Sequence, residues 1–442
     1  MLSKLKKKID RDIHLKELLT GSSVTFLLKM LGMLLGYTLI YIISNRNGAE
    51  GVGNYNIFLK TIMVIGTLTS LGINVAVLRY IGQFNNPTSL GKIKSLYNQG
   101  FKTVFLLSVF TSLIIYFNAE KIVSLIGKSK EQIFYLKLLS IGLPFFSLNK
   151  VNVEFIRGFK KLQLSELIRS VIRPIFIITM LLVWRKNDFD NFDILNLLLI
   201  GIFLNWIISS LIILKKIKSL NKFKQNLFSY KELIGTAFPM MITSVSTILL
   251  ISLPIFFLDY FYTQIEVGIF SVVYQISMLI SIVMIIINTI VAPKFSELYW
   301  ANKIVTLQRF INQSVNLMFL IAMFSSIAVI FFSDYILNIF GSEFLLGKNI
   351  LIILVIGQLV SSSCGSVGIL MNMVGKQKVQ RNINLIVLII CFFLYLFIVP
   401  KYGLMGSSIV FMFGLVLKNI ISTIYIKKKM GLNTFFNPFN KI

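Results

Sequence analysis

Residues 25–43 read TFLLKMLGMLLGYTLIYII, an apolar run with one full positive charge, Lys29, inside it. A run of this length spans the roughly 30 Å hydrocarbon core of a bilayer as an α-helix. A lysine near the centre of such a helix costs about 2.5–3.5 kcal/mol on insertion scales. The stretch therefore predicts a membrane helix and asks what keeps its lysine in place.

The composition of the whole chain agrees with a membrane protein. Of 442 residues, 56% are hydrophobic, and the mean hydropathy is +0.82. The net charge of +27 could indicate a nucleic-acid partner, but the basic residues lie in short gaps between apolar runs and form no continuous basic face. Cys364 and Cys391 lie inside apolar runs, and His14 is the single histidine, so no metal site is expected.

Twelve apolar runs predict twelve transmembrane helices and no soluble catalytic domain. No cleavable signal peptide is expected, because the first run is too long and lacks a cleavage site. With both termini cytoplasmic, the inner segments carry 31 of the 44 lysines and arginines, the outer loops 8, and five lie within the runs. The positive-inside rule favours this orientation. The predicted spans are 18–44, 53–79, 101–118, 132–155, 166–184, 193–214, 233–258, 267–292, 310–333, 348–373, 383–400 and 404–426.

The two halves of the chain match each other at an offset of 215 residues. KELL from Lys16 becomes KELI from Lys231, and VGNY from Val52 becomes VGIF from Val267. A duplication of six spans predicts two six-helix lobes related by a pseudo-twofold axis along the membrane normal, with a cavity between them. The predicted parts are a basic amphipathic segment (1–17), a first lobe (18–214), a basic cytoplasmic linker (215–231), a second lobe (232–427) and a cytoplasmic tail (428–442). The first segment lies on the inner leaflet or is a disordered basic tail.

The charges inside the predicted spans are mainly positive. Lys29, Lys60 and Lys418 lie well inside, whereas Lys137 and Lys150 lie nearer the ends of their span and could extend to the interface. A cavity with excess positive charge attracts anions, and lysine binds phosphate well as a point charge. The alternative for Lys29 and Lys60 is a structural pairing with carbonyl groups or polar side chains.

Polar side chains recur on otherwise apolar helices and indicate an interior face. Lys60, Thr67 and Asn74 follow each other at seven-residue spacing, which predicts one shared face. Gln275 occupies the repeat position of Lys60. Such stripes also serve as interhelical hydrogen bonds, and this alternative stays open. Gly32 and Gly36 form a GxxxG pattern that predicts close helix contact.

Residues 21–84 read GSSVTFLLKMLGMLLGYTLIYIISNRNGAEGVGNYNIFLKTIMVIGTLTSLGINVAVLRYIGQF. This segment resembles the first two spans of polysaccharide-unit flippases of the multidrug/oligosaccharidyl-lipid/polysaccharide exporter superfamily. The features are a basic residue before LG in the first span, GAEGVGNY at the first outer turn, and LGIN…LRYI closing the second span. RGFKKLQ, from Arg157, also fits. Related flippases line their cavity with basic residues in the first span, and Lys29 matches that position. The spans here use lysine where relatives often use arginine, which leaves two-pronged phosphate recognition without a residue.

The resemblance implies a flippase that moves undecaprenyl-pyrophosphate-linked oligosaccharide repeat units to the outer leaflet by alternating access, for O-antigen or capsule synthesis. Lys29 and Lys60 are then expected to hold the pyrophosphate, with Lys418 and Lys137 as helpers. Asn74, Gln275, Asn288 and Gln358 are expected to contact sugar hydroxyls or line the lumen.

No catalytic residue, metal or cofactor is expected, and coupling to a proton or sodium gradient, known in the superfamily, has no assignable site. The expected location is the bacterial inner membrane. The expected partners are the lipid-linked glycan, membrane lipids, a polysaccharide polymerase and glycosyltransferases, with a monomeric chain and no nucleic acid. The alternatives are a multidrug or other lipid-linked exporter of the same fold, and an integral-membrane glycan polymerase or ligase.

Overall fold

The computed structural model describes residues 13–84, 90–128, 130–183, 191–220 and 228–436. All regular elements of these residues are helices. Residues 1–12 of the amphipathic segment predicted for 1–17 lie outside the described residues. By their contacts the residues divide into two compact units, one formed by 1–42 and 61–245 and the other by 43–60 and 246–442.

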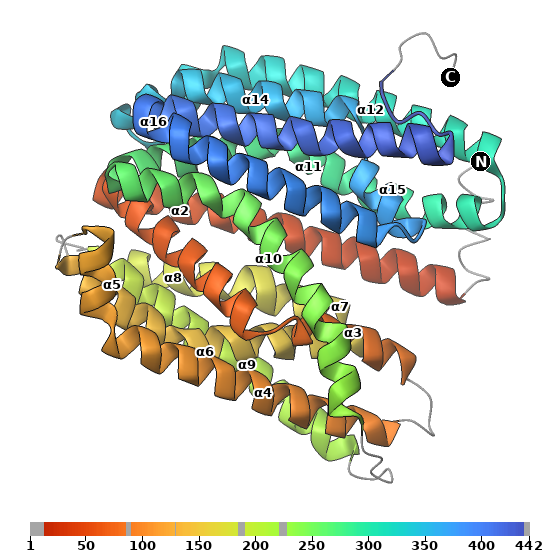
Figure 1. Cartoon of the computed structure of the whole chain (residues 1–442), viewed down its shortest axis with the longest axis horizontal. Helices are drawn as coiled ribbons and strands as arrows, with labels where there is room; N and C mark the ends of the chain where they lie inside the picture. Colours follow the sequence, from red (N-terminus) through yellow and green to blue (C-terminus); the bar gives the residue numbers. More distant parts are fainter. Residues whose placement is uncertain (1–12, 85–89, 129, 184–190, 221–227, 437–442) are drawn as a thin grey trace. The chain divides into compact units, whose positions relative to one another are not determined.

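The first unit is built from α2 to the first half of α10. Figure 1 shows its helices in red to light green, with α4, α6 and α9 side by side. The helices are α2 (Ile13–Thr69, shared with the second unit), α3 (Ile73–Gln83), α4 (Leu90–Phe117), α5 (Ala119–Ile126), α6 (Glu131–Gly158), α7 (Leu162–Glu166), the π-helix η1 (Leu167–Val171), α8 (Ile172–Val183), α9 (Asn191–Leu220) and α10 (Tyr230–Phe261, also shared).

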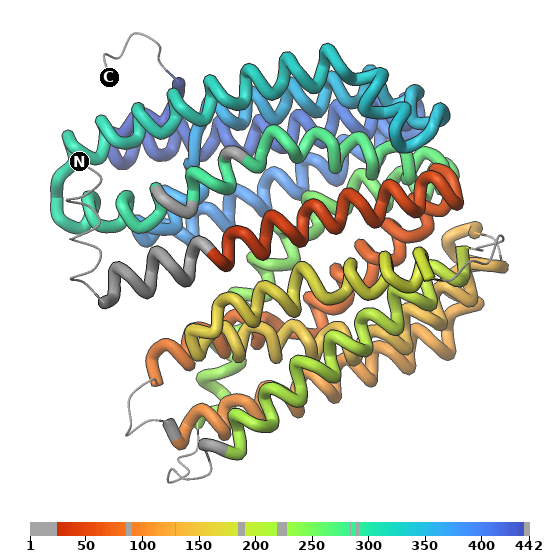
Figure 2. Tube along the Cα trace, turned by 180° about the vertical axis from the view of Figure 1, so that it is seen from behind, coloured from red at the N-terminus to blue at the C-terminus, as the bar shows by residue number. Residues whose placement is uncertain are grey.

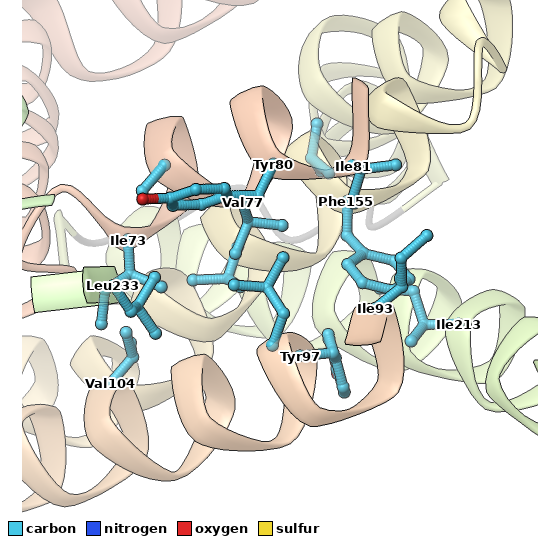
Figure 3. Packing of buried hydrophobic residues seen from close by; sticks show 14 of the residues in the cluster. Ile73, Val77, Tyr80, Ile81, Ile93, Tyr97, Val104, Phe155, Ile213 and Leu233 are labelled. Atoms are coloured by element: carbon cyan, nitrogen blue, oxygen red, sulfur yellow. The ribbon is translucent and has the colours of Figure 1, made fainter. Parts of the chain in front are cut away.

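The core of the first unit lies where α3, α4 and α6 meet. Ile73, Val77 and Ile81 repeat at four-residue spacing on α3 and are fully buried. Figure 3 shows these side chains in one cluster with Val104 and Tyr97 of α4 and Phe155 of α6. Burial of one such aliphatic side chain contributes about 1.5–3 kcal/mol. This core holds the C-terminal part of α6, which carries several of the charges described below.

The second unit contains the remaining helices, and its long helices run alongside one another (Figure 2). The helices are α11 (Gln264–Trp300), α12 (Ile304–Phe331), α13 (Ser333–Phe340), the 3-10 helix η2 (Ser342–Gly347), α14 (Lys348–Ser363), α15 (Val367–Met373) and α16 (Gln377–Met430).

Eight helices of the described residues are long and apolar enough to cross a membrane. Two of these segments, 24–69 and 377–430, are 46 and 54 residues long, more than twice the roughly 20 residues that one crossing needs. Each is interrupted by a glycine with positive φ, Gly48 (63°) and Gly403 (49°). The chain is therefore a multi-pass membrane protein. The total of twelve crossings and the lobe boundaries remain predictions.

Short helices occupy two connections that the sequence analysis treated as loops. α5 and α13 are 8 residues each, and they begin 214 residues apart, close to the offset of the sequence repeat. Each follows a long apolar helix after a single intervening residue, and each carries an acidic residue in its first turn. The two short helices thus share the offset of the sequence repeat, which hydropathy alone does not reveal.

Candidate functional site

Lys29 is exposed, and the surface of α2 on which it lies is the one turned away from the lipid-facing stripe. Leu27 and Leu34 mark that stripe, with 63% and 60% of their surface exposed. Lys29 follows Leu27 by two residues, or about 200° around the helix. It shares its face instead with Gly36 and Ile40, and Ile40 is 4% exposed. Lys29 therefore lies on the face of α2 that is buried against other helices at Ile40, three turns later.

A close helix contact lies one turn from Lys29, as the GxxxG pattern predicts. A Cβ placed on Gly32 would lie 2.6 Å from the Cβ of Ser170 in η1. This contact brings the face of Lys29 next to η1 and α8. Among the described residues, Lys29 has no ion-pair or hydrogen-bond partner, so the structural pairing considered for it is not found.

Lys60 and Lys150 differ in whether their ammonium groups have a hydrogen-bond partner among the described residues. Lys60 is half-buried in α2 and has no ion pair or hydrogen bond within the described part of the chain. Lys150 of α6 instead donates to the Thr67 hydroxyl at 2.6 Å. Lys150 therefore pairs with an interior hydroxyl and does not extend to the interface as the sequence suggested.

Asn74 does not continue the face of Lys60 and Thr67, contrary to the seven-residue spacing. Leu71 and Gly72 both have positive φ, 50° and 73°, so α2 ends and α3 begins between Thr67 and Asn74. Helical periodicity is lost across such a break. Asn74 is buried, and its side-chain carbonyl accepts from Ser70 at 3.4 Å.

Lys418 lines a small cavity within the second unit. The cavity has a volume of about 60 Å³. Its wall contains Tyr395, Cys391 and Phe411 besides aliphatic side chains, and it holds no carboxylate. Lys418 is half-buried, and no described residue pairs with it. An ammonium in such a wall is a candidate for an anion, as the sequence predicts.

The remaining predicted site residues are already engaged. The Lys137 ammonium lies 5.6 Å from the centre of the Tyr116 ring. Asn288 accepts a hydrogen bond from Ser366. Gln358 is 2% exposed and accepts from Ser281 at 2.7 Å, while Gln275 is half-buried and also has a partner. For Asn288 and Gln358, these are the interhelical hydrogen bonds left open as an alternative.

The first unit contains charged residues that the sequence analysis did not single out. Glu154 of α6 accepts from Arg169 of η1 at 2.5 Å and from Arg157 at 3.5 Å. Four residues after Arg169, Arg173 lies in α8, and its Nε is buried without a partner in the described residues. Arg169 and Arg173 were counted as loop charges although the predicted span 166–184 contains them. Their positions inside that predicted span could have identified them as charges within a membrane helix.

Arg169 lies in the π-helix η1, a deformed turn just before Pro174. Pro174 has no N–H to donate to the carbonyl of Ser170, and a helix commonly deforms just before a proline. The carbonyl of Ile168, inside η1, accepts from the Asn205 side chain of α9 at 3.1 Å. Because π-helical turns recur at functional sites, this segment is a candidate for a functional role as well as a structural one.

The arrangement is suited to binding anions. Within the described residues, unpaired cations lie in helices of both units, and the carboxylates near them are already bonded, Glu154 to two arginines and Glu166 to Ser170 at 2.6 Å. No cluster of three metal-ligand side chains occurs in the described part of the chain. Charge of one sign in membrane helices is retained mainly where it meets a ligand or an ion.

Comparison with known proteins gives a family and a fold. A family model described as "Polysaccharide biosynthesis protein" matches residues 18–299. The capsular polysaccharide biosynthesis protein CapF of Staphylococcus aureus is 22% identical over 387 residues, which cover 87% of this chain and 93% of CapF.

Solved structures of transporters share the fold. An inward-facing multidrug resistance MATE family transporter of the MOP superfamily matches with a TM-score of 0.74 at 13% identity, covering 92% of this chain and 98% of its own. The lipid II flippase MurJ in an inward closed conformation matches with a TM-score of 0.71 at 18% identity, covering 92% and 87%. The predicted polysaccharide family is confirmed by the family model, and the solved structures show the fold.

Proposed function

We propose, from the premise that this chain belongs to the polysaccharide biosynthesis protein family, that it flips undecaprenyl-pyrophosphate-linked oligosaccharide repeat units from the inner to the outer leaflet of the bacterial cytoplasmic membrane. The glycan serves capsule or O-antigen synthesis. The similarity to CapF, a capsular polysaccharide biosynthesis protein, supports a role in capsule synthesis. The similarity in fold to a lipid II flippase supports a lipid-linked substrate.

One observation carries the proposal: cations without carboxylate partners lie in the membrane helices. Lys29, Lys60 and Lys418 have no ion pair with any described residue. Leaving a charge unpaired in the membrane is costly, so a ligand of opposite charge is the simplest compensation. A diphosphate carries more than one negative charge and could engage several of these cations in turn.

The lysines have different roles in this proposal. Lys29 and Lys60 hold the diphosphate, because they are unpaired and partly accessible. Lys418 is a helper in its own small cavity, and Lys137 is a weaker one because its ammonium already lies over Tyr116. Asn74 and Gln358 are buried whereas Gln275 and Asn288 are half-buried, so Gln275 and Asn288 are the better candidates for sugar hydroxyls.

Charge separates this function from its closest rival. A multidrug exporter of the same fold that carries cations needs free carboxylates in its helices, whereas Glu154 and Glu166 are bonded. A glycan polymerase or ligase needs an external domain with catalytic groups. Inner-membrane residence and cytoplasmic termini follow in this proposal from the excess of basic residues on one side of the predicted spans.

The test is replacement of Lys29 or Lys60 by alanine in a strain that depends on this protein for its surface polysaccharide. Each variant should lose surface polymer and accumulate the lipid-linked repeat unit on the cytoplasmic side, while its amount in the membrane stays normal. Lys303→Ala, which removes an exposed lysine from the end preceding α12, serves as the matched control and should leave polymer unchanged. Normal polymer from both Lys29→Ala and Lys60→Ala would refute the phosphate-binding role.

A further inference from the structure

Arg173 differs from the other arginines near it because no described residue neutralises it. Arg157 and Arg169 both pair with Glu154. The Nε of Arg173 is buried, and the residue has no hydrogen bond or ion pair within the described part of the chain. Arg173 is half-buried, and a charged side chain in a membrane helix that pairs with no described residue is costly, so its presence is explained by a ligand that is bound during function.

Arg173 lies far from both ends of its helical stretch. The helical stretch α7–η1–α8 runs from Leu162 to Val183, and Arg173 lies near its midpoint, about 16 Å from the start by the rise of an α-helix. Ile175 and Leu182, 41% and 60% exposed, mark the lipid-facing side of α8. Arg173 lies two and nine residues from them, about half a turn away from both. Its side chain therefore faces the protein.

Helix α9 holds the stem of Arg173 in place. A Cβ added to Gly201 would lie 3.1 Å from the Cγ of Arg173, closer than ordinary van der Waals contact. The backbone of Gly201 does not need a glycine, because its φ is not positive. A glycine inside a helix costs about 0.5–1 kcal/mol relative to alanine. What Gly201 provides here is room for the arginine stem.

A fixed guanidinium offers what the lysines cannot. Its planar fork donates two parallel hydrogen bonds to phosphate oxygens, whereas lysine acts as a point charge. The sequence resemblance left this recognition without a residue, and α8 supplies one.

We propose that Arg173 binds a phosphate group of the lipid-linked substrate as it passes through the membrane. This inference rests on the proposed function. The phosphate of a resident phospholipid has the same chemistry, but such head groups lie at the membrane surface, and Arg173 lies near the middle of its helical stretch. The substrate head group, which must cross the membrane, is the phosphate that reaches this depth.

The experiment measures binding of undecaprenyl diphosphate, and separately of phosphatidylglycerol, to the purified full-length protein by ligand-induced thermal stabilisation. Arg173→Gln should weaken binding of undecaprenyl diphosphate about 10- to 100-fold, the loss of a charge-assisted hydrogen bond. Arg173→Lys should lie in between. Gly201→Leu, which keeps the arginine but displaces its stem, should also weaken binding. The control Arg309→Gln removes an exposed arginine from α12 and should bind like the wild type.

The outcomes separate this inference from the proposed function. Equal binding of undecaprenyl diphosphate by wild type, Arg173→Gln and Gly201→Leu would overturn the role of Arg173 and leave the proposed function standing. Binding through Arg173 of phosphatidylglycerol alone would overturn the assignment of the substrate. A wild-type protein that binds neither lipid would overturn the proposed function and this inference with it.

Discussion

Replacing Gly53 or Gly268 by alanine should destabilise the protein more than any other glycine-to-alanine change tested beside it. Both glycines lie in the second unit, where α2 and α11 approach backbone to backbone. A Cβ on Gly53 would lie 1.9 Å from the carbonyl oxygen of Gln264. A Cβ on Gly268 would lie 1.8 Å from the carbonyl oxygen of Ala49. Neither obstacle is a flexible side chain.

The magnitude follows from how far the helices must separate. Real Cβ atoms keep at least 3.0 Å from such neighbours, so the backbones must move apart by more than an ångström at this point. Extra atoms in a packed interior cost about 1–3 kcal/mol. Because the backbone itself must move, we expect the upper end of this range. For a domain of about 200 residues, this corresponds to a loss of about 6–12 °C in melting temperature.

The assay is thermal unfolding of the purified protein in detergent. Gly235→Ala in α10 and Gly82→Ala in α3 are matched controls, because no atom lies within 4 Å of the added Cβ in either case. These controls should melt at the wild-type temperature or slightly above it, since alanine is favoured over glycine inside a helix. If Gly53→Ala and Gly268→Ala melt within 1–2 °C of the controls, roughly the effect of half a kcal/mol, the close contact of α2 and α11 is wrong.

Two further changes probe the candidate site and its support. Lys29→Arg should retain more surface polymer than Lys29→Gln, because charge is what the unpaired ammonium supplies; equal amounts of polymer, at equal protein levels in the membrane, would contradict this. Asn205→Ala should lower the free energy of unfolding by about 1–2 kcal/mol, because the buried carbonyl of Ile168 loses its donor. Thermal unfolding measures this loss. Ser170→Ala, which removes only a partly buried hydrogen bond to Glu166, is measured beside it and tests whether the π-helix depends on Asn205.

Hydropathy was sufficient to predict the class of the protein, whereas the negative charge of its ligand, inferred from the lysines, stays a prediction. The long helices and the unpaired Lys29, Lys60 and Lys418 are both present in the structure. Local backbone breaks were the main source of error. Because Leu71 and Gly72 have positive φ, Asn74 does not lie on its expected face. Neither a leucine nor a single glycine in an apolar run is enough to predict such a break.

Arg169 and Arg173 were missed for a different reason. A rule that counts lysines and arginines by side of the membrane assigns every arginine near a boundary to a loop. The rule works for orientation because a few misassigned charges do not change the majority. It fails for site prediction because the misassigned charges are those that enter the membrane with a helix. Glu154, in the C-terminal part of α6, pairs with Arg169 and so links this arginine to a second long helix.

The repeated glycines connect the sequence repeat to the structure. Gly53 and Gly268 occupy equivalent positions in VGNY and VGIF, 215 residues apart, and so do their contact partners Ala49 and Gln264. Each glycine approaches the partner from the other half, so the two contacts exchange under the offset of the duplication, as a local twofold relation requires. Their preceding turns differ, since Gly48 breaks α2 with a positive φ whereas Thr263 caps α11 together with Glu266. The two halves thus keep the contact while using different chemistry to begin the helix, which indicates that the close approach, rather than the turn sequence, is what the duplicated fold requires.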